Sequence, residues 1–103
     1  MTPDPRFAAR KDNNQPEIER TLTAANYRWW DLHKQGFGVP DLLVLSKTYV
    51  PVVVECKKIG EKLTELEEIF FDEYEGPKGI AHDGQEAVDL MAYWDGYRLE
   101  ATT

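Results

Sequence analysis

One stretch of the chain, from Gly38 to Lys57, constrains its fold more than any other. Within it, Leu42 to Leu45 and Val52 to Val54 are short apolar runs, and the second run is entirely β-branched. The segment between the two runs has the composition of a loop. Two short apolar runs joined by a tight loop predict a β-hairpin.

The register of this hairpin follows from its loop. If Leu45 pairs with Pro51, the numbers of facing residues sum to about 96, so Asp41 falls opposite Glu55. Side chains alternate between the two faces of a strand, so Lys57 shares a face with Glu55. The sequence therefore predicts two carboxylates facing each other at one end of a sheet, with an ammonium group beside them.

Two opposed carboxylates repel each other unless a proton or a cation lies between them. Oxygen ligands at such spacing suit a hard divalent ion such as Mg²⁺ or Mn²⁺. A neighbouring lysine could hold an attacking water or stabilise charge that develops on a phosphate. Asp41, Glu55 and Lys57 thus predict a site for phosphodiester hydrolysis. The alternative is a solvent-facing strand end that carries Glu and Lys by chance.

These residues also carry a family resemblance. Gly38-Val-Pro-Asp-Leu-Leu-Val44, followed after a loop by Val53-Val-Glu-Cys-Lys57, resembles the PD-(D/E)xK nuclease superfamily. Within it, the chain is similar to small stand-alone phage members of the virus-type replication-repair nuclease (VRR-NUC) family. The similarity extends over about residues 11–92. It implies a restriction-endonuclease-like fold and a structure-selective DNA endonuclease, with branched DNA or Holliday junctions as candidate substrates.

The resemblance also implies roles for individual residues. Asp41, Glu55 and the carbonyl group of Cys56 would bind Mg²⁺ or Mn²⁺, and Lys57 would orient or activate water. Glu17, on the first helix, would assist through a water molecule. Alternatively, Glu17 is an acidic residue of the first turn that interacts with the helix dipole.

One position departs from the family pattern. Many members carry a glutamine on the helix after the lysine, whereas this chain has Glu67 in the nearest corresponding place. The departure makes the contribution of this helix to positioning water an open question.

Composition limits the remaining possibilities. A chain of 103 residues is one domain, and its only cysteine excludes an internal disulfide and suits a reducing cytoplasm, which for a phage protein is that of the host. No apolar run is long enough to span a membrane. The net charge of −7 is unevenly distributed: residues 1–63 carry +2 and residues 64–103 carry −9. A DNA partner is therefore more compatible with the first part of the chain.

We expect an α/β fold in which a small mixed sheet, with the hairpin at its centre, is flanked by helices in the order α-β-β-β-α-β-α. A flexible arm (1–10) would precede the domain (11–93), and a tail (94–103) would follow it. The expected elements outside the hairpin are a helix from about residue 14 with Ile18, Leu22 and Ala25 buried; a strand from Tyr27 to His33; a helix from Thr64 to Glu75 with a capping box and Leu66, Ile69, Phe70 and Tyr74 as its core stripe; a strand from Lys78 to His82; and a helix from Gln85 to Tyr93.

Aromatic residues raise the question of partners. Trp29 and Trp30 are adjacent and cannot both enter one core, so one of them should face a second subunit or a stacked nucleobase. With Trp94 and Tyr97, they offer apolar area for a homodimer. His33 is either a proton shuttle or phosphate contact, or a structural residue at a strand end.

Two alternatives to the endonuclease remain open. The first is a non-catalytic interaction module that kept the nuclease fold, for example a phage packaging or replication accessory protein. The second is a restriction-type enzyme that reads a fixed sequence, for which the chain has no room for a separate recognition domain.

Overall fold

The computed structural model describes residues 13–97, which form a mixed α/β fold. The elements are α1 (Gln15–Ala24), β1 (Arg28–Asp31), the 3₁₀ helix η1 (His33–Gln35), β2 (Leu42–Leu45), β3 (Pro51–Cys56), α2 (Glu65–Glu73), β4 (Lys78–Ala81) and α3 (Gly84–Asp95). Apart from η1, their order is the predicted one. The predicted arm (1–10) and the end of the predicted tail (98–103) lie outside the described residues.

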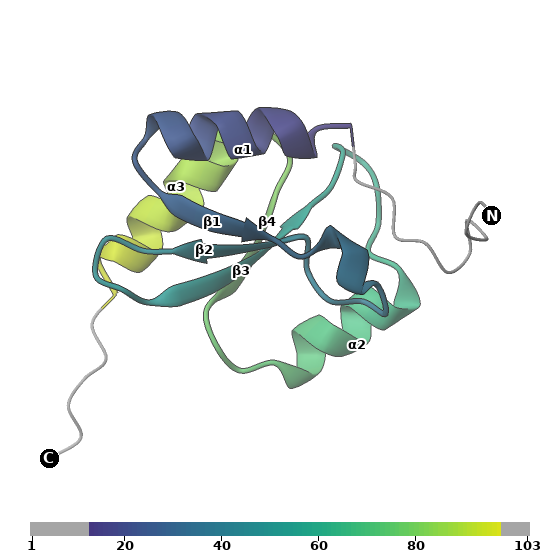
Figure 1. Ribbon diagram of the computed structural model, residues 1–103. Coiled ribbons are helices and arrows are strands. Elements are labelled where there is room, and N and C mark those ends of the chain that lie inside the picture. The colour runs from purple at the N-terminus through teal and green to yellow at the C-terminus, as the bar shows by residue number, and fades with distance from the viewer. Residues whose placement is uncertain (1–12, 98–103) are drawn as a thin grey trace, which may run out of the picture.

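The sheet has four strands in the order β1-β2-β3-β4, with the β2–β3 hairpin at its centre (Figure 1). Strand β2 is antiparallel to both β1 and β3, and β4 runs parallel to β3. In the hairpin, Leu45 pairs with Pro51 and Leu42 with Val54. The predicted register is therefore confirmed.

Helices α1 and α3 cover one face of the sheet, and α2 lies on the other side (Figure 1). The core lies between the sheet and the first two of these helices. Its fully buried members include Ile18 and Leu22 of α1, as predicted, Ala87 and Met91 of α3, and alternate residues of the hairpin. Ala25, also predicted to be buried, is only partly buried. Because Val52, Val54 and Cys56 point into this core, the other set of β3 side chains points toward α2.

Strand β1 is shorter than predicted. It ends at Asp31, and His33 belongs to η1 rather than to the strand. The Asp31 carboxylate accepts a hydrogen bond from the backbone N–H of His33 at 2.9 Å, and such a turn competes with continuation of the strand. Of the two tryptophans, Trp29 packs against the core and Trp30 is 46% exposed, which confirms that only one enters the core.

Helix α2 begins with the predicted capping box between Thr64 and Glu67. Its predicted core stripe is wrong, however, because none of its residues is buried and Leu66 and Ile69 are exposed. Phe70 packs against its neighbour Phe71 and against Tyr74, the residue that caps the helix. Helical periodicity reports an apolar face, and it does not report whether another element covers that face.

The last helix, α3, extends past the predicted end at Tyr93 to Asp95, so the predicted boundary at residue 93 cuts through it. Trp94 packs against the core. None of the helices within residues 13–97 is long and apolar enough to cross a membrane.

Candidate active site

The hairpin register places two carboxylates at one end of the sheet. Leu42 faces Val54, so the next pair along the ladder is Asp41 and Glu55. Both side chains are buried, Asp41 at 9% exposure and Glu55 at 1%. Asp41 Oδ2 accepts a hydrogen bond from the backbone N–H of Cys56 at 2.8 Å, which fixes one carboxylate against the end of β3.

This arrangement disfavours two negative charges. Burial raises the pKa of Glu55 to about 10, and the negative charge of Asp41 and a hydrogen bond with Glu67 add to the shift. Glu55 Oε2 is also buried without a hydrogen-bond partner in the structure. A buried carboxylate oxygen that lacks a partner is costly. Glu55 therefore either keeps a proton or requires a cation beside it.

The third predicted residue, Lys57, lies at the same end of the sheet and is 7% exposed. Its Nζ forms a salt bridge of 2.8 Å with Glu67 Oε1 on α2. Burial is the largest single influence on the pKa of Glu67 and raises it, but the contacts with Lys57, the backbone of Thr64 and Glu55 together outweigh burial, so the Glu67 pKa is lowered. The same Oε1 accepts the N–H of Thr64 in the capping box at 2.8 Å. Helix α2 thus holds the ammonium group in place.

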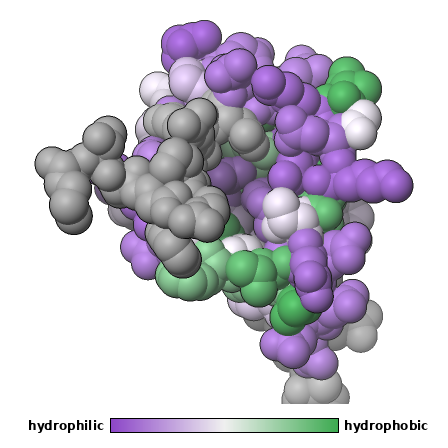
Figure 2. Space-filling view, turned by 90° about the vertical axis from the view of Figure 1, so that its right-hand side faces the viewer, coloured by the Kyte–Doolittle hydropathy of each residue, from purple (hydrophilic) through white to green (hydrophobic). Residues whose placement is uncertain are grey.

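A pocket of about 430 Å³ opens beside these residues. It is lined by Asp41, Lys57 and Glu67, by the start of α2 from Thr64 to Leu66, and by the segment that includes His33 and Gly36 to Val39. Figure 2 views the side of the molecule on which η1 and the start of α2 lie in Figure 1. This face is mostly hydrophilic, with separate hydrophobic patches.

The loop that forms the pocket wall has an unusual backbone. Gly36, Phe37 and Gly38 all have positive φ angles, and Phe37 is 80% exposed. A Cβ atom on Gly38 would lie 2.3 Å from the carbonyl oxygen of Leu66. Glycine at position 38 therefore lets the loop before β2 touch the first turn of α2, which closes the pocket on one side.

Glu17 is not placed with the other predicted site residues. It does not line the pocket, and its Oε2 accepts the backbone N–H of Gly84 at 2.8 Å. Gly84 begins α3, so Glu17 places a negative charge at the N-terminus of that helix. The alternative prediction for Glu17 is an interaction with the dipole of its own helix, α1. The contact seen here is also an interaction with a helix N-terminus, but that of α3.

The side chain of Cys56 lies in the core, whereas its backbone lies at the candidate active site. Its side chain is fully buried among core residues, and its backbone N–H binds Asp41. The sulfur is therefore part of the core, and the role implied for this residue concerns its carbonyl group alone.

Two polar residues at this end of the sheet, Asn14 and Gln15, make contacts that the sequence did not predict. Asn14 donates from Nδ2 to the carbonyl oxygens of Lys57 and His82, both at 2.9 Å, and so ties the start of α1 to the ends of β3 and β4. Gln15, fully buried, donates from Nε2 to Asp31 Oδ1 at 3.0 Å. In the sequence, the sign of these contacts is the pair Asn14-Gln15 before Pro16. Such a pair predicts where a helix begins, and it does not predict which distant residues the two side chains contact.

The carboxylate oxygens at this end of the sheet are also candidate ligands for a metal ion. Among residues 13–97, no group of three or more His, Cys, Asp or Glu side chains is arranged to hold a metal ion. Mg²⁺ commonly binds through one or two carboxylates plus water and substrate phosphate. The unpartnered oxygen of Glu55, with Asp41 opposite, fits that smaller ligand set.

Comparisons with protein-family models, with curated proteins and with solved structures found no match to this chain.

Proposed function

We propose that this protein is a DNA endonuclease that depends on Mg²⁺ or Mn²⁺, with a restriction-endonuclease-like fold of the VRR-NUC type. The observation that carries the proposal is the buried pair of Asp41 and Glu55 at the end of the central hairpin, with Lys57 beside it. A pair of this kind is costly to the fold without a cation. Asp41 of the pair lines the pocket together with Lys57, which contributes an ammonium group.

In this proposal, Asp41, Glu55 and the Cys56 carbonyl group hold the ion. The bound ion would supply charge stabilisation at the phosphate and a more acidic water. Lys57 orients the attacking water and faces the charge that develops on the phosphate. The water oxygen loses a proton to solvent and bonds to phosphorus, the bond from phosphorus to the leaving sugar oxygen breaks, and that oxygen takes up a proton.

The proposed substrate is branched DNA, including four-way junctions, cut by a homodimer in the cytoplasm of a cell or phage-infected host. Symmetric cutting of a junction needs two active centres, and one chain has one pocket of this composition within its described residues. The less acidic first part of the chain contributes the β2–β3 hairpin and the loop around Phe37, so the pocket lies largely on that part.

The test is incubation of the purified protein with labelled linear, flapped and four-way DNAs in Mg²⁺, Mn²⁺ or EDTA. We expect cleavage with either ion, none in EDTA, and a preference for the branched forms. Metal should also raise the melting temperature of the wild-type chain, and Asp41→Asn should lose most of that increase. An unchanged melting temperature together with intact DNA in every tube would contradict the proposal.

One observation favours a second candidate, a non-catalytic DNA-binding or packaging module. The ammonium group of Lys57 is engaged by Glu67 at 2.8 Å, and so is already neutralised in the structure. In such a module, Lys57→Ala would weaken DNA binding by one phosphate contact and reduce its salt dependence. No cleavage would exist for the substitution to change.

A further inference from the structure

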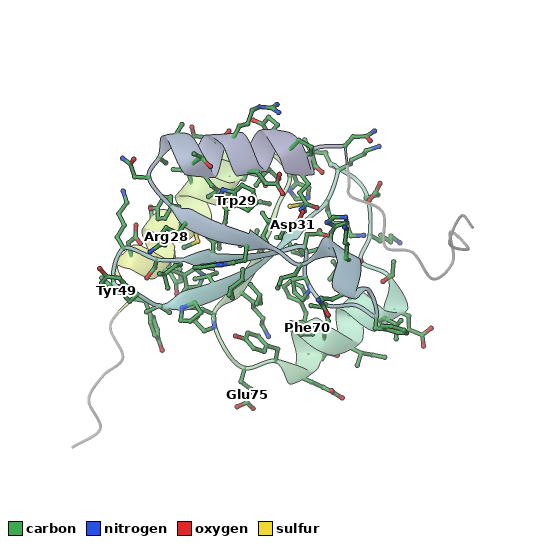
Figure 3. The ribbon with its side chains drawn as sticks, in the orientation of Figure 1. Arg28, Trp29, Asp31, Tyr49, Phe70 and Glu75 are labelled. Atoms are coloured by element: carbon green, nitrogen blue, oxygen red, sulfur yellow. The ribbon has the colours of Figure 1, made fainter. Side chains whose placement is uncertain are left out.

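A second polar group, outside the Asp41–Glu55–Lys57 set, lies at the same pocket. His33 lines the pocket, and its Nδ1 lies 2.6 Å from Asp31 Oδ1. Asp31 stands at the end of β1, beside η1 (Figure 3). An aspartate that accepts from Nδ1 fixes the proton on that nitrogen, so Nε2 is the ring nitrogen left for the pocket.

The carboxylate of Asp31 is itself held in place. Its Oδ1 accepts the backbone N–H of His33 at 2.9 Å and the Nε2 group of Gln15 at 3.0 Å. Gln15 is fully buried and also donates to Glu19 Oε2 at 3.0 Å, and Glu19 is 7% exposed. Helix α1 therefore contributes buried polar side chains whose hydrogen bonds converge on the carboxylate that orients His33.

The other histidine of the described chain provides a comparison. His82, which precedes α3, makes the same type of contact, from Nδ1 to Glu86 Oε1 at 2.7 Å, four residues along the chain. Glu86 has no buried glutamine behind it in the structure and is half exposed, and His82 does not line the pocket. A histidine–carboxylate pair is thus not special in itself. The pair at His33 differs in its buried support and in its place at the pocket.

We propose that His33 is a further catalytic residue, the general acid that protonates the leaving sugar oxygen, with Asp31 as its positioning residue. This inference rests on the proposed nuclease function. Lys57 and the carboxylate pair serve the attacking water and the phosphate, so the leaving group needs a separate proton donor. As the bond from phosphorus to the leaving oxygen breaks, the Nε2 proton of the imidazolium passes to that oxygen. Asp31 fixes the orientation of the ring through its contact with Nδ1, and the neutral ring regains its proton from solvent.

The decisive variant is His33→Asn. The Asn side chain amide can still donate to Asp31 from the position of Nδ1, so the local turn is kept while Nε2 is lost. The matched control is His82→Asn, which makes the same change at the other histidine. Each protein is assayed on two forms of the DNA that wild type cuts: normal DNA, and DNA with sulfur in place of the leaving oxygen at the mapped cut. A thiolate leaves without needing a proton.

On normal DNA, His33→Asn should lower the cleavage rate by about 10² or more, which is the usual contribution of a general acid. On the sulfur-substituted DNA, its rate should be within a few-fold of wild type. Asp31→Asn should show the same selective loss to a smaller extent, and His82→Asn should cut both substrates normally. Binding of the uncut DNA in EDTA, measured by fluorescence anisotropy, should stay within a few-fold for all the variants.

The outcomes separate the two proposals. If wild type cleaves DNA and His33→Asn is slowed equally on both substrates, the general-acid role is wrong. The same holds if His33→Asn is slowed on neither substrate. In both cases the proposed nuclease function still stands. If weaker DNA binding accounts for the whole loss, His33 is a phosphate contact and the assignment also fails. If wild type cuts neither substrate with Mg²⁺ or Mn²⁺, the proposed function is overturned and this inference with it.

Discussion

Glu55 is the residue on which the electrostatics of this site depend. Its folded-state pKa of about 10 lies above its ordinary value of 4.5, because burial and then Asp41 disfavour the carboxylate. Between these values the folded chain holds a proton that the unfolded chain has lost. The free energy of unfolding should therefore fall as the pH rises from about 4.5 to about 10, in the absence of metal, because the unfolded chain releases this proton and the folded chain keeps it.

Glu55→Gln removes this titration, so the melting temperature of the variant should exceed that of wild type by a margin that grows from about pH 5 to about pH 9 in EDTA. Glu73→Gln, at an exposed position of α2, is the control and should follow wild type. Thermal unfolding over the pH series measures the difference. A margin that stays constant would mean that Glu55 is ionised in the folded protein.

The ammonium group of Lys57 should affect turnover more than DNA affinity. Its charge is useful mainly when negative charge builds on the scissile phosphate, so Lys57→Ala should reduce turnover by about 10² or more and change DNA affinity only a few-fold. The substitution also leaves Glu67 without the lysine in a largely buried contact, which should lower the melting temperature.

A double variant separates these two effects. Lys57→Met with Glu67→Gln removes both charges, so it should recover melting temperature and leave turnover low. Glu55→Gln should abolish cleavage as well, by weakening metal binding. Wild-type cleavage by Lys57→Ala would assign the activity to another site or to a contaminant.

At the scale of elements, the contact between the loop before β2 and the start of α2 shapes the pocket. Gly38 has φ +83°, and a Cβ there would lie 2.3 Å from the Leu66 carbonyl oxygen. Gly60 has nearly the same backbone, φ +85°, with nothing within 4 Å of its Cβ position. Gly60→Ala thus adds only backbone strain, about 1 kcal/mol, whereas Gly38→Ala adds a clash that costs about 1–3 kcal/mol more.

Chemical denaturation of the two alanine variants measures this difference. Gly38→Ala should also lose cleavage, because it pushes α2 away and with it Glu67, which holds Lys57. Equal destabilisation by the two substitutions would show that the loop and the helix are not packed against each other as described.

How much of this could be predicted depends on how local each feature is. The hairpin and its register followed from alternation and loop length, and they alone bring Asp41 opposite Glu55. The exposure of α2 could not be predicted, because the spacing of its apolar residues does not report that none of them is buried. The contact of Gln15 with Asp31 joins residues on different elements, and no period in the sequence reports it.

At the scale of the whole molecule, the aromatic residues that stay exposed are unevenly placed. Trp30 is on β1, whereas the exposed Tyr49 and Tyr97, with the partly buried Trp94, line an apolar groove of about 350 Å³ near the tip of the hairpin. Isolated exposed apolar side chains are ordinary, and a group of aromatics around a groove is typical of an interface. The groove also lies at the opposite end of the hairpin from Asp41 and Glu55.

We therefore expect the predicted homodimer to form through this groove by an isologous contact, with Tyr49, which is 80% exposed, inserted into or against its partner. Wild type should sediment as a dimer at about tens of micromolar, a concentration that would reveal even a weak association. Tyr49→Ser should shift it to the 11.9 kDa monomer, and Trp30→Ser should not.

Because the pocket lined by Asp41 and Lys57 is remote from the groove, the Tyr49→Ser monomer should still nick one strand of a junction while losing paired cuts. Dissociation by Trp30→Ser instead would move the interface to the β1 edge, and a wild-type monomer at that concentration would remove the dimer altogether.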